Sequence, residues 1–172
     1  MKEKPDAITN VRELLWYGGY LEGWALYVEF ISYDYAARMY SDRGVEELAN
    51  AVSLTKHNRN LLLGLYSLLD IMIHYENADR EQVAALLSGF GITNEESISA
   101  IYQYIVEEPT NYLKYYLGYL EILALKEQAQ KLWGDSYTDL AFHTYLLQSG
   151  PADFTLLEKA LRSWPLPQLT KS

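Results

Sequence analysis

The chain has 172 residues, of which 49% are hydrophobic, and a formal net charge of −9. This acidity argues against a nucleic acid as partner, because a phosphate backbone attracts a basic surface. The absence of cysteine excludes disulfides, thiolate metal sites and cysteine nucleophiles, and no run of about 20 apolar residues predicts a transmembrane helix.

The first half of the chain predicts two long helices, because apolar residues recur there at spacings of three and four. We expect the first helix to begin near Gly19, since glycines weaken the helix at this point, and to end near Asp42–Gly44. The second is predicted from Val45 to Tyr75. Its stretch Leu61–Leu69 is apolar enough to be buried on nearly all sides.

The second half of the chain predicts shorter helices with recognisable caps. Asp79 is placed to cap one helix, and Thr93, with Glu96 three residues later, has the spacing of a capping box. Pro109 ends one helix or begins the next. The predicted helices of this half cover residues 79–87, 94–106, 109–133, 138–148 and 155–163.

The fold class that follows is all-α, because strand-like alternation never persists beyond a few residues. We predict about seven helices, two or three of them long, packed as an irregular bundle. Residues 11–164 are expected to form one helical domain. Residues 1–10 are expected to be a disordered start, without the apolar segment of a signal peptide, and residues 165–172 a frayed tail.

Two carboxylates, Glu22 and Glu29, interrupt the apolar segment GGYLEGWALYVEF, residues 18–30. Seven residues are two helical turns, so both carboxylates point the same way. A buried carboxylate is costly unless it is paired, hydrogen-bonded or bound to a metal. The pattern leaves open whether this is a buried site or a solvated strip on an amphipathic helix.

Two histidines also lie among apolar residues. His74 follows Asp70 by four residues, so the carboxylate can orient the imidazole or form a purely structural pair with it, and the pair alone favours the structural role. His143 lies on a short apolar helix, where a lone histidine is typically a core or rim residue. With His57, the three histidines are too dispersed to form a metal site by local spacing.

Tyrosine is unusually frequent, with sixteen residues against four phenylalanines. Because a buried hydroxyl needs a partner, this indicates a polar-lined interior or a face that meets another molecule. Tyr112, Tyr115 and Tyr119 share one helix face, and Gly118 beside them indicates close approach of another backbone. Such a stripe is typically core, although a tyrosine hydroxyl in a cleft can donate to an oxyanion.

Four segments, in this order, resemble the C-terminal half of the bacterial domain-of-unknown-function 885 family. The resemblance runs from Val11 to about Trp164 and implies a helical, zincin-like fold and a zinc metallopeptidase. The segments are EGWALYVE, DIMIHYENADREQVAALL, PTNYLKYYLGYLEI and FHTYLLQSGPADFTLLE.

The resemblance also implies roles for single residues. In that family an HExxH-type helix supplies two histidine ligands and a glutamate base, and the glutamate of EGWA is the third zinc ligand, here Glu22. Tyr115 is implied to polarise the substrate carbonyl, and His143 to contact substrate or the tetrahedral intermediate. Glu29 is implied to support the site without binding metal. The residues implied to line or brace the cleft are Asp70, His74, Tyr112 and Tyr119.

Two departures from the family pattern stand out. The HExxH segment is absent and is expected to lie upstream of Met1, in a missing N-terminal half. Leu63 and Tyr66 stand where the family often has arginines, which indicates altered substrate recognition or a divergent branch. Since a catalytic zinc needs three protein ligands, we expect this chain alone to bind no zinc and to be inactive, with zinc and a peptide-like substrate bound only by the full-length protein.

Two other hypotheses about the function of this chain remain beside the peptidase. One is a non-catalytic helical interaction module derived from the same scaffold, and the other is a helical adaptor unrelated to peptidases. If the chain is a fragment, the apolar, tyrosine-rich face on which the missing half packs is expected to cause self-association. Relatives are exported or lipid-anchored, or otherwise cytoplasmic, and the sequence does not choose between these compartments.

Overall fold

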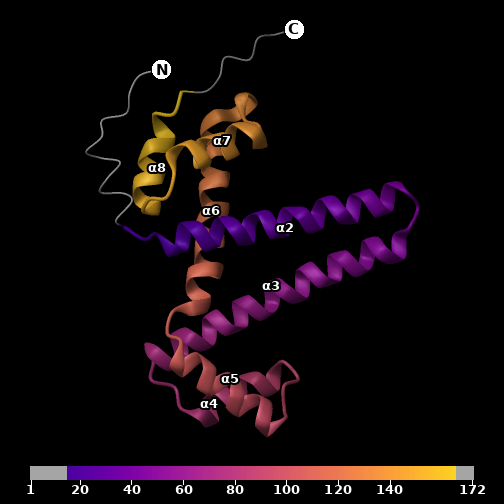
Figure 1. Ribbon diagram of the computed structural model, residues 1–172, viewed down its shortest axis with the longest axis vertical. Coiled ribbons are helices and arrows are strands. Elements are labelled where there is room, and N and C mark those ends of the chain that lie inside the picture. Colours follow the sequence, from indigo (N-terminus) through magenta and orange to yellow (C-terminus); the bar gives the residue numbers. More distant parts are fainter. Residues whose placement is uncertain (1–14, 166–172) are drawn as a thin grey trace. The chain divides into compact units, whose positions relative to one another are not determined.

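The computed structural model describes residues 15–165 of the chain (Figure 1). These residues form seven α-helices, one short 3-10 helix and no β-strand, which confirms the all-α prediction. The predicted disordered start and frayed tail lie outside the described residues, apart from Pro165. The elements are α2 (Gly18–Asp42), α3 (Glu46–His74), α4 (Arg80–Gly89), α5 (Glu95–Glu107), α6 (Asn111–Trp133), η1 (Gly134–Ser136), α7 (Asp139–Ser149) and α8 (Phe154–Arg162).

The helix caps follow the sequence signals with one exception. Asp79 caps α4, and it forms the reciprocal capping box with Gln82, each backbone N–H donating to the other side chain at 2.9 Å. The cap predicted at Thr93 is wrong. Asn94 caps α5 instead, because its side-chain oxygen lies 2.8 Å from the backbone nitrogen of Ser97 and accepts its hydrogen bond.

The described residues divide into two compact units, residues 15–25 with 117–165 and residues 26–116. Helices α2 and α6 each contribute one end to each unit. The single domain predicted over residues 11–164 stays a prediction. Among the described residues, no helix combines the length and apolar character needed to cross a membrane.

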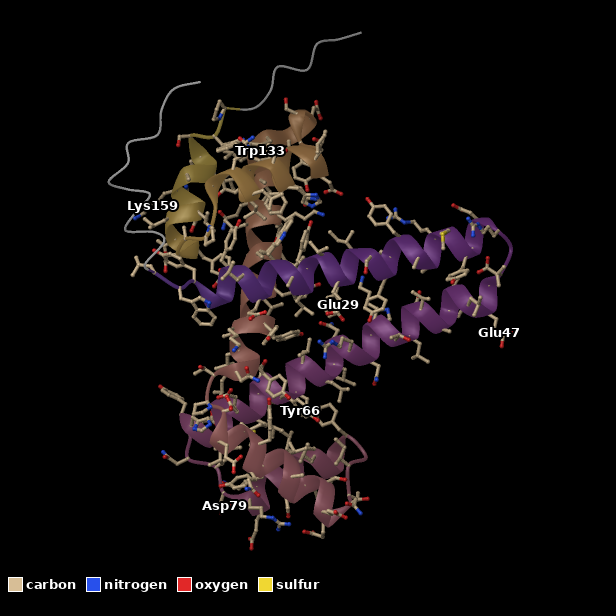
Figure 2. The ribbon with its side chains drawn as sticks, in the orientation of Figure 1. Glu29, Glu47, Tyr66, Asp79, Trp133 and Lys159 are labelled. Atoms are coloured by element: carbon tan, nitrogen blue, oxygen red, sulfur yellow. The ribbon has the colours of Figure 1, made fainter. Side chains whose placement is uncertain are left out.

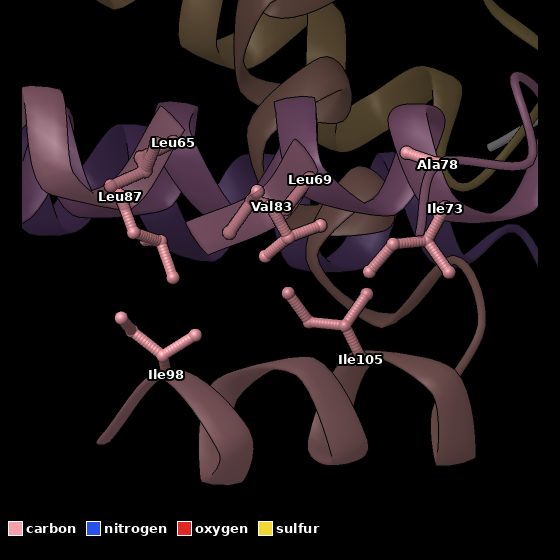
Figure 3. Close-up of a cluster of buried hydrophobic side chains, with 8 residues drawn as sticks. All are labelled: Leu65, Leu69, Ile73, Ala78, Val83, Leu87, Ile98 and Ile105. Carbon is pink, nitrogen blue, oxygen red and sulfur yellow. The ribbon is translucent and has the colours of Figure 1, made fainter. Parts of the chain in front are cut away.

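The core of the second unit, residues 26–116, lies where α4 and α5 pack on the C-terminal half of α3 (Figure 3). Residues four apart lie on one side of a helix, so α3 presents a single apolar stripe to this core. The cluster is completed by the link before α4 and by both short helices. Its members are Leu65, Leu69, Ile73, Ala78, Val83, Leu87, Ile98 and Ile105.

One stripe of α3 stays open, and it runs through Leu61 and Leu68, which are seven residues apart and therefore share a side of the helix. Leu61 is 53% exposed and Leu68 44% exposed, whereas Leu63, Leu65, Ser67 and Leu69 are buried, so the prediction that Leu61–Leu69 is buried on nearly all sides fails only along this stripe. Leu65 and Leu69 face the core that α4 and α5 complete, and Leu63 and Ser67, about half a turn away from Leu65, are buried on the other side of α3. In the unit's other part, α2 lies along α3, and Lys56 pairs with Asp34 at 2.7 Å.

The first unit, residues 15–25 with 117–165, is built around α7 and α8, which pack against each other. The hydroxyl of Tyr145 is buried and donates to the carbonyl of Leu157 on α8. Burial raises the pKa of Tyr145 to about 12, so this hydroxyl keeps its proton. Tyr20, at the start of α2, donates to the carbonyl of Leu146 at 2.8 Å and ties α2 to α7.

Candidate functional site

Glu22 lies on the first turns of α2, in the first unit, and is half-buried. Within the part of the chain that the structure describes, its carboxylate has no hydrogen-bond or ion-pair partner. A partly desolvated carboxylate gains from a cation or a donor, and the described residues supply neither to Glu22.

The backbone on either side of Glu22 is held against α6. A β-carbon built on Gly23 would lie 2.3 Å from the carbonyl carbon of Gly118, and one built on Gly118 would lie 2.0 Å from the carbonyl oxygen of Gly19. Any side chain larger than hydrogen is therefore excluded at this crossing. The close backbone approach predicted from Gly118 is confirmed, and it fixes the position of Glu22 on α2 relative to α6.

His143 lies on α7 in the same unit and is half-buried. Its ring meets the ring of Trp24 edge-on, with centroids 5.5 Å apart. Burial lowers the pKa of His143, and Lys126 adds to this effect, whereas the carboxylate of Asp139 opposes it. The imidazole therefore favours its neutral form.

Asp139 organises the polar groups near this histidine. Its carboxylate accepts a hydrogen bond from the Tyr137 hydroxyl at 2.7 Å and pairs with Lys126 at 2.9 Å, and both interactions hold its pKa below the ordinary value. The sequence analysis missed Asp139, although it precedes His143 by four residues, the same spacing as Asp70 and His74.

The structure does not bring His143 into contact with Glu22. A helix turns by about 100° per residue, so Trp24 and its neighbour His143 lie on a different side of α2 from Glu22. Tyr119, the other predicted cleft residue of this unit, follows Gly118 on α6 and is half-buried. Their predicted roles toward a substrate stay predictions.

Asp70, in the second unit, lies where α3 meets the start of α6. Its side chain is 1% exposed, and its Oδ1 accepts a hydrogen bond from the backbone N–H of Thr110 at 3.2 Å. The Oδ2 atom is buried without a hydrogen-bond partner in the structure. Because α6 begins at Asn111, the carboxylate also faces the positive end of a helix dipole. Asp70 therefore anchors the turn between α5 and α6.

His74 is adjacent to Asp70 but is bonded elsewhere. Its Nε2 lies 2.9 Å from the carbonyl oxygen of Ile105, to which it can donate, and 3.9 Å from Oδ1 of Asp70. The longer distance exceeds that of a hydrogen bond. The histidine thus links the end of α3 to α5, and whether either residue also faces a substrate stays a prediction.

Tyr112 and Tyr115 also belong to the second unit. The ring of Tyr112 packs edge-on against Tyr66, with centroids 4.9 Å apart, and lies 5.9 Å from the ring of Tyr104. Burial raises the pKa of Tyr112, and so do the two neighbouring tyrosines. The ammonium nitrogen of Lys114 lies over the ring of Tyr115, 5.5 Å from the ring centroid.

Glu29, predicted to support the site, points from α2 toward α3 in the second unit (Figure 2). Its Oε1 accepts hydrogen bonds from Arg59 at 3.2 Å and from the Tyr33 hydroxyl at 3.4 Å. The two carboxylates of the EGWALYVE segment therefore differ, because Glu29 is paired with described residues and Glu22 is not.

A zinc site cannot be assembled from the described residues alone. Residues 15–165 contain no group of three histidine, aspartate or glutamate side chains placed to hold a metal ion. A catalytic zinc has three protein ligands, so the described side chains do not fit a complete site, and Glu22 can supply only one ligand.

The family model that matches residues 1–161 is described as a bacterial protein of unknown function, DUF885. The chain belongs to the DUF885 family. A solved structure, titled a "putative lipoprotein" from Colwellia psychrerythraea, is similar to this DUF885 chain at 29% sequence identity and a TM-score of 0.64. The similarity covers 86% of the DUF885 chain and 24% of that chain, so the present sequence spans about a quarter of its length. No curated protein matches.

Proposed function

We propose that this chain is the C-terminal part of a zinc-dependent metallopeptidase and that Glu22 is one ligand of its metal. The observation that carries the proposal is the state of Glu22, a half-buried carboxylate without a partner among the described residues. It sits on a stretch of α2 whose glycines touch α6, so its backbone position is fixed. A carboxylate held in place and left unpaired suits coordination of a cation.

The remaining ligands would come from an HExxH-type helix outside the described residues. Two facts support this assignment. Membership of the DUF885 family accounts for the order of the four motifs, and the similar solved chain is about four times as long as the part that this sequence matches. The described side chains do not complete a metal site by themselves.

The other predicted residues are proposed to act on the substrate, a peptide or modified peptide. His143 is neutral near pH 7, since burial lowers its pKa, so it can accept a hydrogen bond or a proton. The Tyr115 hydroxyl is a donor for a substrate oxygen. The residues proposed to line or brace the cleft are Asp70, His74, Tyr112 and Tyr119.

Export or lipid anchoring is proposed for the protein that contains this chain. The support is the description of the similar Colwellia structure as a "putative lipoprotein".

A second candidate function is a non-catalytic helical interaction module. It is favoured by exposed apolar residues on α3, where Leu54 is 70% exposed and Leu61 53% exposed. Apolar side chains gathered on one helix mark a surface that another protein covers.

The complete gene product that contains this sequence provides the test, in its original form and as Glu22→Gln and Glu47→Gln variants. Glu47 is an exposed carboxylate on the first turn of α3 and serves as the matched control (Figure 2). Each protein is incubated with a mixture of peptides, and the products are identified by mass spectrometry. We expect hydrolysis to fall at least 100-fold in E22Q and to persist in E47Q. Equal activity of E22Q and the original protein, or hydrolysis that a chelator leaves intact, would refute the proposal. No hydrolysis together with saturable binding of a partner protein would support the module.

A further inference from the structure

A tyrosine-walled pocket opens on the second unit, beside its apolar core. Its volume is about 230 Å³, and it is lined by side chains from α3, α5 and the start of α6. Tyr66 contributes the wall from the part of α3 that faces α5 (Figure 2). Tyr104 at its rim is 45% exposed, so the pocket can be reached from solvent. The lining residues are Tyr66, Ala100, Ile101, Tyr104, Ile105 and Tyr112.

The walls of this pocket are held in place without a ligand. Tyr112 packs edge-on against Tyr66, with centroids 4.9 Å apart, and lies 5.9 Å from Tyr104. The Tyr104 hydroxyl accepts a hydrogen bond from the Asn111 amide at 3.3 Å. Fixed walls lower the entropy cost of binding, so a group that fits the space loses little affinity to rearrangement.

The volume suits one ring-sized group. An apolar cavity of about 150 Å³ in another protein holds benzene, so about 230 Å³ accommodates a phenyl ring or an indole. Ala100, which lines the pocket from α5, has a small side chain and fills little of the space. Aromatic rings prefer edge-to-face contacts with centroids about 4.5–7 Å apart, and the three tyrosine rings offer faces and edges for such contacts.

The lining of the pocket offers a cation no ionic partner. No carboxylate lines it, and the positive charge of Arg59 acts on Tyr112, where it partly offsets the upward shift of the pKa that burial causes. A guanidinium or ammonium group would lose its hydration in an apolar space that offers no carboxylate in return, and only the faces of the tyrosine rings would offset this cost. A neutral ring meets no such cost.

We propose that this pocket binds the neutral aromatic side chain of a peptide substrate, of the size of phenylalanine or tryptophan. The peptide nature of the ligand rests on the proposed function. Recognition of the ring itself needs only the described residues of the second unit, and it requires no metal.

The test is a titration of the whole 172-residue chain with N-acetylphenylalanine amide, followed by ¹H–¹⁵N NMR. N-acetylleucine amide and N-acetyllysine amide are titrated in parallel. We expect the phenylalanine probe to shift the amides of Ile101 and Tyr104 saturably, with an affinity in the millimolar range for one ring. The leucine probe should bind at least threefold more weakly, and the lysine probe should give no saturable shift.

Ala100→Trp is the blocking variant, because its indole would fill the pocket from an exposed helix position. Ala51→Trp on α3 is the matched control, since Ala51 is also an exposed helical alanine and does not line the pocket. Binding should fall at least tenfold in A100W and persist in A51W, with equal helicity of both variants by circular dichroism.

Three outcomes would overturn the inference. These are no saturable shift at Ile101 and Tyr104, equal binding of the lysine probe, or unchanged binding in A100W. If this chain binds the ring saturably but the complete gene product hydrolyses no peptide, the proposed peptidase function is refuted and the proposed aromatic pocket is supported. Hydrolysis by the complete gene product without saturable ring binding by this chain would refute the aromatic pocket alone.

Discussion

Gly23 on α2 and Gly118 on α6 touch through their backbones, so closely that a β-carbon on Gly23 would lie 2.3 Å from the carbonyl carbon of Gly118. Backbone atoms cannot move aside as a flexible side chain can. The contact therefore fixes how the start of α2 crosses α6, and with it the position of Glu22, which immediately precedes Gly23. The glycine of the EGWA segment is explained by this packing.

Gly23→Ala is expected to destabilise the protein by about 1–3 kcal/mol, because the added methyl group overpacks a backbone contact. The loss occurs although alanine is the better helix former by about 1 kcal/mol. Urea unfolding monitored by circular dichroism measures it. Gly89→Ala on α4 is the control, since a β-carbon there meets nothing within 4 Å. Equal stability of the G23A variant and the original protein would contradict the close contact.

Asp70→Ala is expected to cost about 1–3 kcal/mol, because the backbone N–H of Thr110 would lose its acceptor. Asp70→Asn should cost less, since its amide oxygen can still accept that hydrogen bond. Denaturant unfolding gives both values, and hydrogen exchange at the Thr110 amide should accelerate in D70A. Equal losses in both variants, without faster exchange, would contradict the anchoring role of Asp70.

Thr110→Asn is expected to raise the free energy of unfolding by about 1 kcal/mol. Thr110 has φ of 63°, a left-handed conformation that a β-branched residue adopts at a cost and that asparagine tolerates. The backbone N–H that donates to Asp70 is unchanged by this substitution. Thermal and urea unfolding check the gain, and a loss of stability would show that the threonine side chain contributes more than its backbone conformation costs.

His143 should make stability depend on pH in a defined window. Burial lowers the folded-state pKa below the ordinary value of 6.5, so between these two values the unfolded chain binds more protons. The contribution is fully present above about pH 6.5 and is lost as pH falls toward the folded-state pKa. NMR titration of the imidazole gives the folded value. His143→Gln should flatten the dependence, and His57→Gln, at an exposed position, serves as the control. A folded-state pKa above 6.5 would contradict the effect of burial.

Much of the fold could be predicted from local pattern. The ends of α2 and α3 follow from apolar spacing and from the glycines at residues 18–19 and 44, and the cap at Asp79 follows from side-chain chemistry. The cap of α5 was misplaced by one residue, because Thr93 and Asn94 are both good caps and only the structure shows which oxygen reaches a free N–H.

Burial and the pocket depend on contacts that local pattern does not encode. Periodicity could not show that one stripe of α3 stays uncovered, so Leu61 and Leu68 were expected to be buried. Tyr104 was missed because its neighbours, Tyr66 and Tyr112, come from other helices. Glu22 was selected through the family resemblance, since spacing alone did not distinguish it from Glu29.

The zinc content of the complete gene product is the most direct test of the central proposal, that Glu22 is a metal ligand. The protein is purified, dialysed against a weak chelator and measured by elemental mass spectrometry, in its original form and as Glu22→Gln and Glu47→Gln. We predict about one zinc per chain for the original protein and for E47Q, and a fall of at least tenfold for E22Q. Full zinc content in E22Q, or no zinc in the original protein, would contradict the account.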